Sequence, residues 1–403
     1  MCQSYKTTLI NNRRYLGNKY RLLPFIKQVV TDHCQNVNAI ADLFAGTGAV
    51  SSAFQDRQII TNDILYSNYI SNLAWFSPQE YNEQKIIAAI EKYNAKQVHT
   101  DNYMSRNFAN TFFSKQDCRK IGYIREDIER MYRGCEINER ERALLITSLL
   151  YAMDKIAKTC GHYDAYRQGV EFDRHLELAV PLASHTNNPN NLCYNQDINQ
   201  LAPQVKADLV YLDPPYNSRQ YCDAYHVLEN VARWEKPEVF GVARKMDRTN
   251  LKSAYCTKEA TAAFENLIQS VNAHYILLSY NNMEKKGNER SNAKLADEDI
   301  LRILQAKGQV QIFEVKALQK IVDMSGTKAS FDYTISYTAK GGIDVFYDSV
   351  EKKLVFQKKW YSTNAYGVQS ANYVASTAIT LKKVAKLISA IEDAQNLANS
   401  QLQ

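Results

Sequence analysis

Residues 39–48 read Ala-Ile-Ala-Asp-Leu-Phe-Ala-Gly-Thr-Gly, a short apolar run that ends at a glycine-rich turn. The small residues that follow, such as Ala49 and Ser51, predict the start of a helix. Strand, glycine-rich turn and helix are the opening unit of a doubly wound α/β sheet. The next apolar run, residues 58–63, ends in Asp63, and a helix is predicted from about Tyr66. The pattern therefore predicts strands that alternate with helices.

The α/β pattern stops and returns further along the chain. From about Pro78 to Asn190 the sequence is helix-like, polar and charged, which indicates a helical insertion. Afterwards the predicted strands are residues 191–197, 207–213 and 274–280, followed by a closing antiparallel pair at 310–315 and 331–338. The predicted fold class is α/β with a Rossmann-like sheet. We expect a catalytic domain over 1–77 and 191–340, a mostly helical insertion over 78–190, and a C-terminal extension over 341–403.

Composition narrows the class of protein. The chain has 403 residues, of which 45% are apolar and 23% charged, as in ordinary globular proteins. No apolar run is long enough to span a bilayer, and the N-terminus lacks the apolar core of a signal peptide. We therefore expect neither a membrane protein nor a secreted one. The eight cysteines form no CxxC pair and have no histidine at zinc spacing, so we expect reduced thiols and no metal.

Charge and tyrosine content leave the partner open. The formal net charge is +6, a mild surplus that permits a polyanionic partner without requiring one. The 27 tyrosines are suited to stacking on nucleic-acid bases. Packing in half-buried positions explains many tyrosines equally well.

The strongest chemical motif is Asp213-Pro214-Pro215-Tyr216, which follows a predicted buried strand. Ligands of open α/β sheets bind at this carboxyl edge. Consecutive prolines fix φ and donate no backbone hydrogen bond, so the turn is rigid and presents acceptors. An exocyclic amine has two N–H donors, one for the Asp213 carboxylate and one for the Pro214 carbonyl, and Tyr216 offers a face for a planar base. The alternative is a proline-containing loop in which Asp213 is only a turn residue.

The stretch Asp42–Gly48 followed much later by Asp213–Tyr216 resembles the S-adenosylmethionine-dependent N6-adenine DNA methyltransferases. The order of motifs, with Arg14–Lys19 before the glycine turn and an insertion before the Asp-Pro-Pro-Tyr motif, is similar to the Dam-like (alpha-group) members. Residues 211–221, with Tyr225-His226 after them, resemble the FokI-type members, and residues 154–166 also resemble a segment of the family. The resemblance covers roughly residues 10–340.

The resemblance implies a class I methyltransferase fold and site-specific methyl transfer to N6 of a flipped-out adenine in double-stranded DNA. It implies S-adenosyl-L-methionine as cofactor, with S-adenosyl-L-homocysteine as product, and no metal. It also implies a modification enzyme of a type II restriction–modification system in the cytoplasm of a bacterium. The cognate restriction endonuclease would be a functional partner rather than a bound one, and the enzyme a monomer or weak dimer. An RNA adenine methyltransferase and an inactive DNA-binding paralogue are the alternatives.

By resemblance, the turn from Asp42 to Gly48 lets the backbone approach the methionine part of the cofactor, and Asp63 accepts from the ribose hydroxyls. The implied cofactor-binding residues are Tyr15, Lys19, Asp42, Phe44, Gly46, Gly48, Asp63, Ile64 and Asp197. Helix or turn capping is the alternative for Asp63 and Asp197, and a phosphate contact is the alternative for Lys19. Because Ser51 stands where a dinucleotide motif has its third glycine, the turn argues against a pyrophosphate ligand.

Three residues after the Asp-Pro-Pro-Tyr turn are candidates for the DNA side of the site. Arg219, Tyr221 and Tyr225 would hold the flipped base or its phosphates, with ordinary packing as the alternative. His226 is interpreted as structural rather than as a general base. The candidate target-recognition region is the charged helical insertion, within which the sequence does not identify the base-reading residues.

Overall fold

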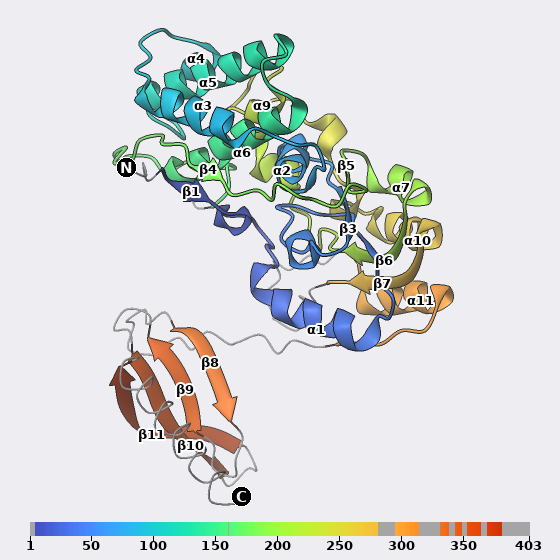
Figure 1. Ribbon diagram of the computed structural model, residues 1–403. Coiled ribbons are helices and arrows are strands. Elements are labelled where there is room, and N and C mark those ends of the chain that lie inside the picture. The colour runs from blue at the N-terminus through green and yellow to red at the C-terminus, as the bar shows by residue number, and fades with distance from the viewer. Residues whose placement is uncertain are drawn as a thin grey trace, which may run out of the picture. The chain divides into compact units, whose positions relative to one another are not determined.

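The computed structural model describes residues 5–159, 161–280 and 295–313, and four further strands between 331 and 380 as backbone elements. The chain divides into two compact units, residues 1–313 and 314–403. The first unit contains a parallel sheet with a mostly helical part beside it (Figure 1). Its boundary with the second unit lies before the predicted extension at 341.

The five-stranded sheet confirms the predicted α/β class. Its order is β5-β3-β2-β6-β7, and every pairing is parallel. The strands are β2 (Ala39–Asp42), β3 (Gln58–Asn62), β5 (Leu192–Tyr194), β6 (Lys206–Leu212) and β7 (Asn272–Leu278). Each overlaps a predicted strand. Because the strands are parallel, their carboxyl ends meet at one edge, which is where ligands of such sheets bind.

Side chains of the central strands alternate between two apolar layers, as the period of two requires. Ile40, Ile59 and Leu209 pack with the helix α1 (Leu23–His33). Their neighbours Ala41, Ile60 and Val210 face the opposite layer. That layer contains α7 (Ile198–Leu201), α10 (Ala260–Ser270) and α11 (Asp297–Lys307). Burial on both faces explains why these strands read as continuous apolar runs.

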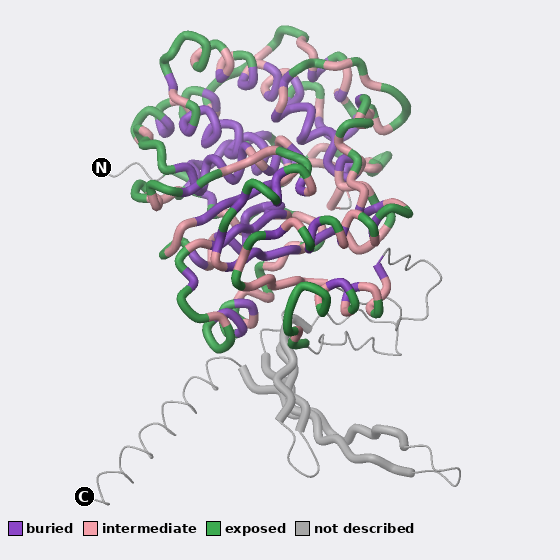
Figure 2. The backbone as a smooth tube through the Cα atoms, turned by 90° about the vertical axis from the view of Figure 1, so that its right-hand side faces the viewer, coloured by how far each residue is buried: buried purple, intermediate pink, exposed green. Residues whose placement is uncertain are grey.

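The predicted insertion is helical through residue 156. Its helices are α3 (Glu83–Ala95), α4 (Tyr103–Phe108), α5 (Lys115–Arg133) and α6 (Glu139–Ile156). They share one apolar core with α2 (Tyr66–Phe76) and α9 (His226–Arg233), which belong to the sheet part of the sequence. The buried backbone of this core runs into the sheet without a break in Figure 2. The insertion therefore packs as part of the first unit.

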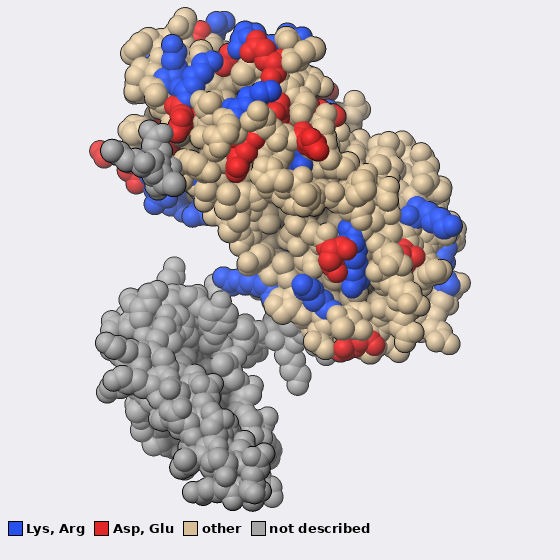
Figure 3. Space-filling view, viewed as in Figure 1, with Lys and Arg blue, Asp and Glu red and all other residues tan. Residues whose placement is uncertain are grey.

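Charged residues of the helical part are mixed in sign. On the face seen in Figure 3, basic and acidic side chains gather together over these helices, and the surface between them and the sheet is mostly uncharged. Helix α5 begins at the cap Ser114, whose hydroxyl accepts from the Asp117 N–H at 3.0 Å. Among the described residues, no helix is long and apolar enough to cross a membrane.

Two local predictions were wrong. The glycine-rich turn leads into a four-residue 3-10 helix, Ser51–Phe54, rather than an α-helix, because only nine residues separate Gly48 from β3. The strand β8 (Phe331–Tyr337) pairs with β9 (Ile343–Asp348) and belongs to the second unit. That unit contains the antiparallel order β11-β10-β9-β8, with β10 at Lys353–Thr363 and β11 at Gln369–Thr380. The closing pair was misassigned because β8's alternating pattern fits either sheet.

A short parallel pairing joins the N-terminal segment to the end of the insertion. Strand β1 (Thr7–Thr8) pairs with β4 (Val180–Pro181). Close by in the fold, the Tyr151 hydroxyl donates to the Ile10 carbonyl at 3.0 Å. These contacts attach the N-terminal segment to the insertion, and the residues that follow, 13–19, lie at the carboxyl edge of the sheet.

Candidate active site

The glycine-rich turn after β2 forms one wall of a cavity at the carboxyl edge of the sheet. Gly46 and Gly48 have φ values of 53° and 77°, which L-residues with side chains rarely adopt. A Cβ at Gly48 would lie 2.4 Å from Asn72 Oδ1, and one at Gly46 would lie 3.1 Å from the Tyr15 ring. The turn therefore requires glycine for both its conformation and its packing.

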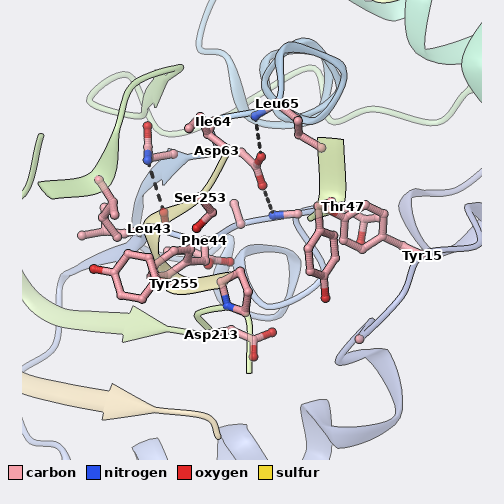
Figure 4. Close-up of a pocket in the computed structure, with 18 of the residues that line it drawn as sticks. Tyr15, Leu43, Phe44, Thr47, Asp63, Ile64, Leu65, Asp213, Ser253 and Tyr255 are labelled. Carbon is pink, nitrogen blue, oxygen red and sulfur yellow. Dashed lines mark hydrogen bonds between the residues drawn. The ribbon is translucent and has the colours of Figure 1, made fainter. Parts of the chain in front are cut away.

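Asp63 lies at the end of β3 and holds the turn in place (Figure 4). One carboxylate oxygen accepts from the Gly46 N–H at 2.9 Å, and the other accepts from the Leu65 N–H at 2.8 Å. Burial raises the pKa of Asp63 to about 6, against these hydrogen bonds that lower it. The neighbouring Ile64 side chain belongs to the same cavity wall. Asp63 thus both closes the local structure and lines the cavity.

Asp42 is the most deeply buried acid of the cavity, with 1% of its surface exposed. Its Oδ2 accepts from the Ser51 hydroxyl at 3.0 Å, while Oδ1 has no hydrogen-bond partner among the described residues. Burial raises the pKa of Asp42 to about 7. An orphaned buried acceptor of this kind is suited to a ligand donor.

The Asp213-Pro-Pro turn follows β6 directly, and Asp213 and Pro215 line the cavity. The Lys19 ammonium donates to Asp213 Oδ2 at 2.5 Å and to the Gly17 carbonyl at 3.0 Å. Burial raises the pKa of Asp213, and the Lys19 charge acts in the opposite direction. The lysine predicted from the N-terminal segment therefore lies against the predicted catalytic carboxylate.

Three tyrosines stack beside this turn. The ring centroids of Tyr15 and Tyr225 are 4.6 Å apart, and those of Tyr15 and Tyr221 are 5.6 Å apart. Tyr225 is 1% exposed, and its hydroxyl accepts from the Leu16 N–H at 2.7 Å. Tyr225, which was predicted to hold DNA, is thus buried in the protein, and its hydroxyl binds the N-terminal segment. Tyr221 remains half-buried and lines the cavity.

The other predicted substrate residues lie outside this stack. Tyr216 is half-buried, edge-on to Tyr280 at 6.3 Å between centroids. Arg219 is exposed.

His226 is 1% exposed, and its ring nitrogens lie 2.9 Å from the Asp223 carbonyl oxygen and 2.7 Å from that of Ala243. Burial lowers the pKa of His226. These contacts agree with the structural interpretation of His226.

The cavity brings most predicted residues together, and the empty space in and around it, open solvent at its mouth included, is about 930 Å³. Asp197 belongs to it, although one of its oxygens also caps α7 by accepting from the Asn199 N–H at 2.9 Å. The predicted residues that line the cavity are Tyr15, Lys19, Asp42, Phe44, Gly46, Asp63, Ile64, Asp197, Asp213, Pro215 and Tyr221. Gly48, Pro214, Tyr216, Arg219 and Tyr225 are not among its lining residues.

Sequence reasoning missed one wall of the cavity, formed by Leu251, Ser253 and Tyr255. Tyr255 lies edge-on to Phe44, with ring centroids 5.2 Å apart. The Gln220 side chain fastens this wall to the catalytic turn, because its amide donates to the Ser253 carbonyl at 3.1 Å and accepts from the Ser253 N–H at 2.8 Å. No motif marks these residues. The one available signal was Tyr255, the aromatic residue of this loop.

The described residues contain no group of three or more His, Cys, Asp or Glu placed to hold a metal ion. The apolar faces and hydrogen-bond acceptors of the cavity instead suit an organic ligand that combines apolar rings with hydroxyl and amine groups. Phe44, Ile64 and Tyr255 supply apolar faces, and Asp42 and Asp63 supply acceptors. S-adenosyl-L-methionine, the cofactor that the resemblance implies, therefore fits the residues that line the cavity.

The chain is similar in sequence to several known methyltransferases. Modification methylase StsI of Streptococcus sanguinis is 34% identical over 76% of this chain and 48% of its own length. Modification methylase LlaI of Lactococcus lactis subsp. lactis is 30% identical over 67% of this chain and 46% of its own length. Type II methyltransferase M.FokI of Planomicrobium okeanokoites is 28% identical over 93% of this chain and 59% of its own length. The chain therefore spans about half the length of these relatives.

A family match extends over residues 15–286, from the N-terminal cofactor segment past the Asp-Pro-Pro-Tyr turn. It includes every predicted site residue and the whole parallel sheet. This chain therefore belongs to the D12 class N6 adenine-specific DNA methyltransferases.

Proposed function

We propose that this chain methylates N6 of a specific adenine in double-stranded DNA, as the modification enzyme of a type II restriction–modification system in the bacterial cytoplasm. The observation that carries the proposal is the Asp213-Pro-Pro turn, which opens into a cavity suited to S-adenosylmethionine. The match to the D12 class and to modification methylases supports the same reaction.

The cofactor would be held by the glycine turn and by the acids around it. Asp42 Oδ1, which has no hydrogen-bond partner among the described residues, suits an ammonium group, and Asp63 suits the ribose hydroxyls. Phe44 and Ile64 would cover the adenine ring, and Asp197 would accept from its amine. S-adenosylmethionine, when bound, supplies an electrophilic methyl group. The chain's own contribution is to exclude water around it and to orient the adenine.

The target adenine must leave the base stack, because its amine is paired inside the duplex. Asp213 and the Pro214 carbonyl would then accept its two N–H groups, which keeps the nitrogen lone pair out of ring conjugation. Tyr216 would stack on the base. Lys19 favours the ionised form of Asp213, since its charge lowers the carboxyl pKa that burial raises. Arg219 and Tyr221 remain the candidates for contacts with the flipped nucleotide.

The test is methyl transfer from labelled S-adenosylmethionine to mixed-sequence duplex DNA, with an RNA arm in parallel. Wild type should place the label in 6-methyladenine of DNA, and Asp213→Ala should lower this by at least about 10³-fold, on the scale of losing a key catalytic group. Asp56→Ala, at an exposed acid that does not line the cavity, is the matched control. Label in RNA only, or equal activity of Asp213→Ala, would contradict the proposal.

A further inference from the structure

Two apolar side chains are exposed on one turn between α9 and α10. Phe240 is 57% exposed and Val242 is 73% exposed. Single exposed apolar residues are common on protein surfaces. Phe240 and Val242 are not isolated in this way, because both lie on the same turn. The segment that contains the turn continues to the cavity wall at Leu251 and Ser253. The segment is yellow in Figure 1.

The turn is closed by its own hydrogen bonds. Phe240 and Lys245 exchange two backbone bonds, of 2.8 and 2.9 Å, and the Arg244 N–H donates to the Gly241 carbonyl at 3.2 Å. Gly241 and Arg244 have φ values of 70° and 53°. A left-handed conformation at an arginine is uncommon and persists only where surrounding structure enforces it. The exposed side chains are therefore presented by a defined backbone.

The base of the turn is fastened to the helices that follow the catalytic motif. Nε2 of the buried His226 ring lies 2.7 Å from the Ala243 carbonyl oxygen. Lys245 Nζ lies 3.5 Å from Asp223 Oδ1, to which Arg248 Nε donates at 2.7 Å. Asp223 belongs to α8 (Tyr221–Ala224), which begins five residues after Tyr216. The tip is thus held at a fixed position relative to the catalytic turn.

The turn also carries basic residues. Residues 239–252 contain four basic residues and one acidic residue. Lys245 and Arg248 are paired with Asp164 and Asp223, whereas Arg244 and Lys252 are exposed. An apolar tip on a positively charged base is complementary to a duplex, whose phosphates surround a stacked apolar interior. The charged residues are Arg244, Lys245, Asp247, Arg248 and Lys252.

We propose that Phe240 and Val242 insert into duplex DNA beside the target adenine, while the exposed Arg244 and Lys252 of the same segment contact the flanking phosphates. The proposal rests on the proposed function. When an adenine leaves the stack, it exposes the faces of neighbouring bases, and an apolar wedge covers them. The turn would then stabilise the opened duplex and leave cofactor binding unaffected.

The experiment compares wild type, the double variant Phe240→Ala/Val242→Ala, and the control Ile312→Ala, whose side chain is 68% exposed after α11. Each is assayed in single turnover on a duplex that carries the mapped site. In a second duplex, the target adenine faces an abasic position, which removes the cost of breaking the pair. Fluorescence of 2-aminopurine in place of the adenine reports base flipping without methyl transfer.

We expect the double variant to lose on the order of 10–100-fold in rate on the paired duplex, because losing the wedge should raise the activation free energy by a modest amount. The rate should return to within about threefold of wild type on the abasic duplex, and the 2-aminopurine signal should fall. Equal rates on the paired duplex, or a loss that the abasic duplex does not restore, would overturn the proposal. Failure of wild type to methylate DNA would instead contradict the proposed function.

Discussion

Buried charges are handled differently at the carboxyl edge of the sheet and in the helical part. At the edge, burial raises the pKa values of Asp42, Asp63 and Asp213. In the helical part, Glu129 lies between Arg125 and Arg142, and its pKa is lowered despite the burial that opposes this. The Glu129 charge is thus neutralised within the helices, whereas Asp42 at the edge keeps an acceptor that has no partner among the described residues. A ligand that brings donors can use this acceptor.

The largest expected effect tests the helical side of this comparison. Glu129→Gln removes the carboxylate that Arg125 and Arg142 share at 2.7 Å each, and leaves two buried cations unpaired. We expect the free energy of unfolding to fall by about 3–5 kcal/mol. The exposed pair Arg302–Glu265 is the control, and Glu265→Gln should leave the free energy of unfolding nearly unchanged, because water screens the pair. Similar losses from both variants in denaturant titrations would contradict the comparison.

The next effect tests the shape of the edge. Gly48→Ala combines a φ of 77° with a Cβ 2.4 Å from Asn72 Oδ1 and 2.7 Å from Phe76. Together these should cost about 2–4 kcal/mol of unfolding free energy. Gly169→Ala has a similar φ of 68° but open space around its Cβ, so it should lose only about 1 kcal/mol. Thermal unfolding of both variants separates packing from backbone strain, and equal losses would assign the whole cost to strain.

The third prediction uses pH. The folded pKa of Asp42 is about 7, against an ordinary value of 3.8, so the folded state binds more protons between these values. Stability should therefore fall as pH rises from about 4 to about 7. Asp42→Asn should raise the free energy of unfolding at pH 8 by on the order of 2 kcal/mol, with no gain below pH 4.

Asp208 provides a control of opposite sign. It accepts from the N–H groups of Asn38 and Ala39, and its pKa is lowered. The stability that Asp208 contributes is present above its ordinary pKa and is lost as pH falls. Asp208→Asn should therefore destabilise the protein at pH 8. If both variants shift stability in the same direction, the contrast between the two acids is wrong.

The smallest effect concerns the Lys19–Asp213 pair. Removing the ammonium in Lys19→Met takes away the charge that lowers the pKa of Asp213. Because Asp213 must be ionised to accept from the adenine amine, the acidic limb of the kcat/KM profile should move to higher pH. Lys19→Arg keeps a cation and should leave the limb nearly in place. An unmoved limb in Lys19→Met would show that Lys19 does not tune Asp213.

Sequence reasoning located the strands and the acids at their ends, because a parallel sheet leaves continuous apolar runs followed by polar residues. It placed Asp213, Asp63 and Lys19 in one site, and they meet in one cavity. It did not find Ser253 or Tyr255, since their position comes from how the loop after α9 folds back. It also expected Tyr225 on the DNA side, although stacking on Tyr15 buries the ring. Burial of a tyrosine depends on distant partners that a local pattern does not contain.

The N-terminal segment has a consequence for the order in which the protein can fold. Lys19 meets Asp213 across 194 positions, and Leu16 meets Tyr225 across 209 positions. Contacts this distant in sequence form late and slow the folding of the whole unit. On the ribosome, residues 13–19 must therefore wait until Tyr225 has been synthesised before the cavity can close. Until then the first two strands expose apolar edges, which makes the growing chain dependent on protection from aggregation.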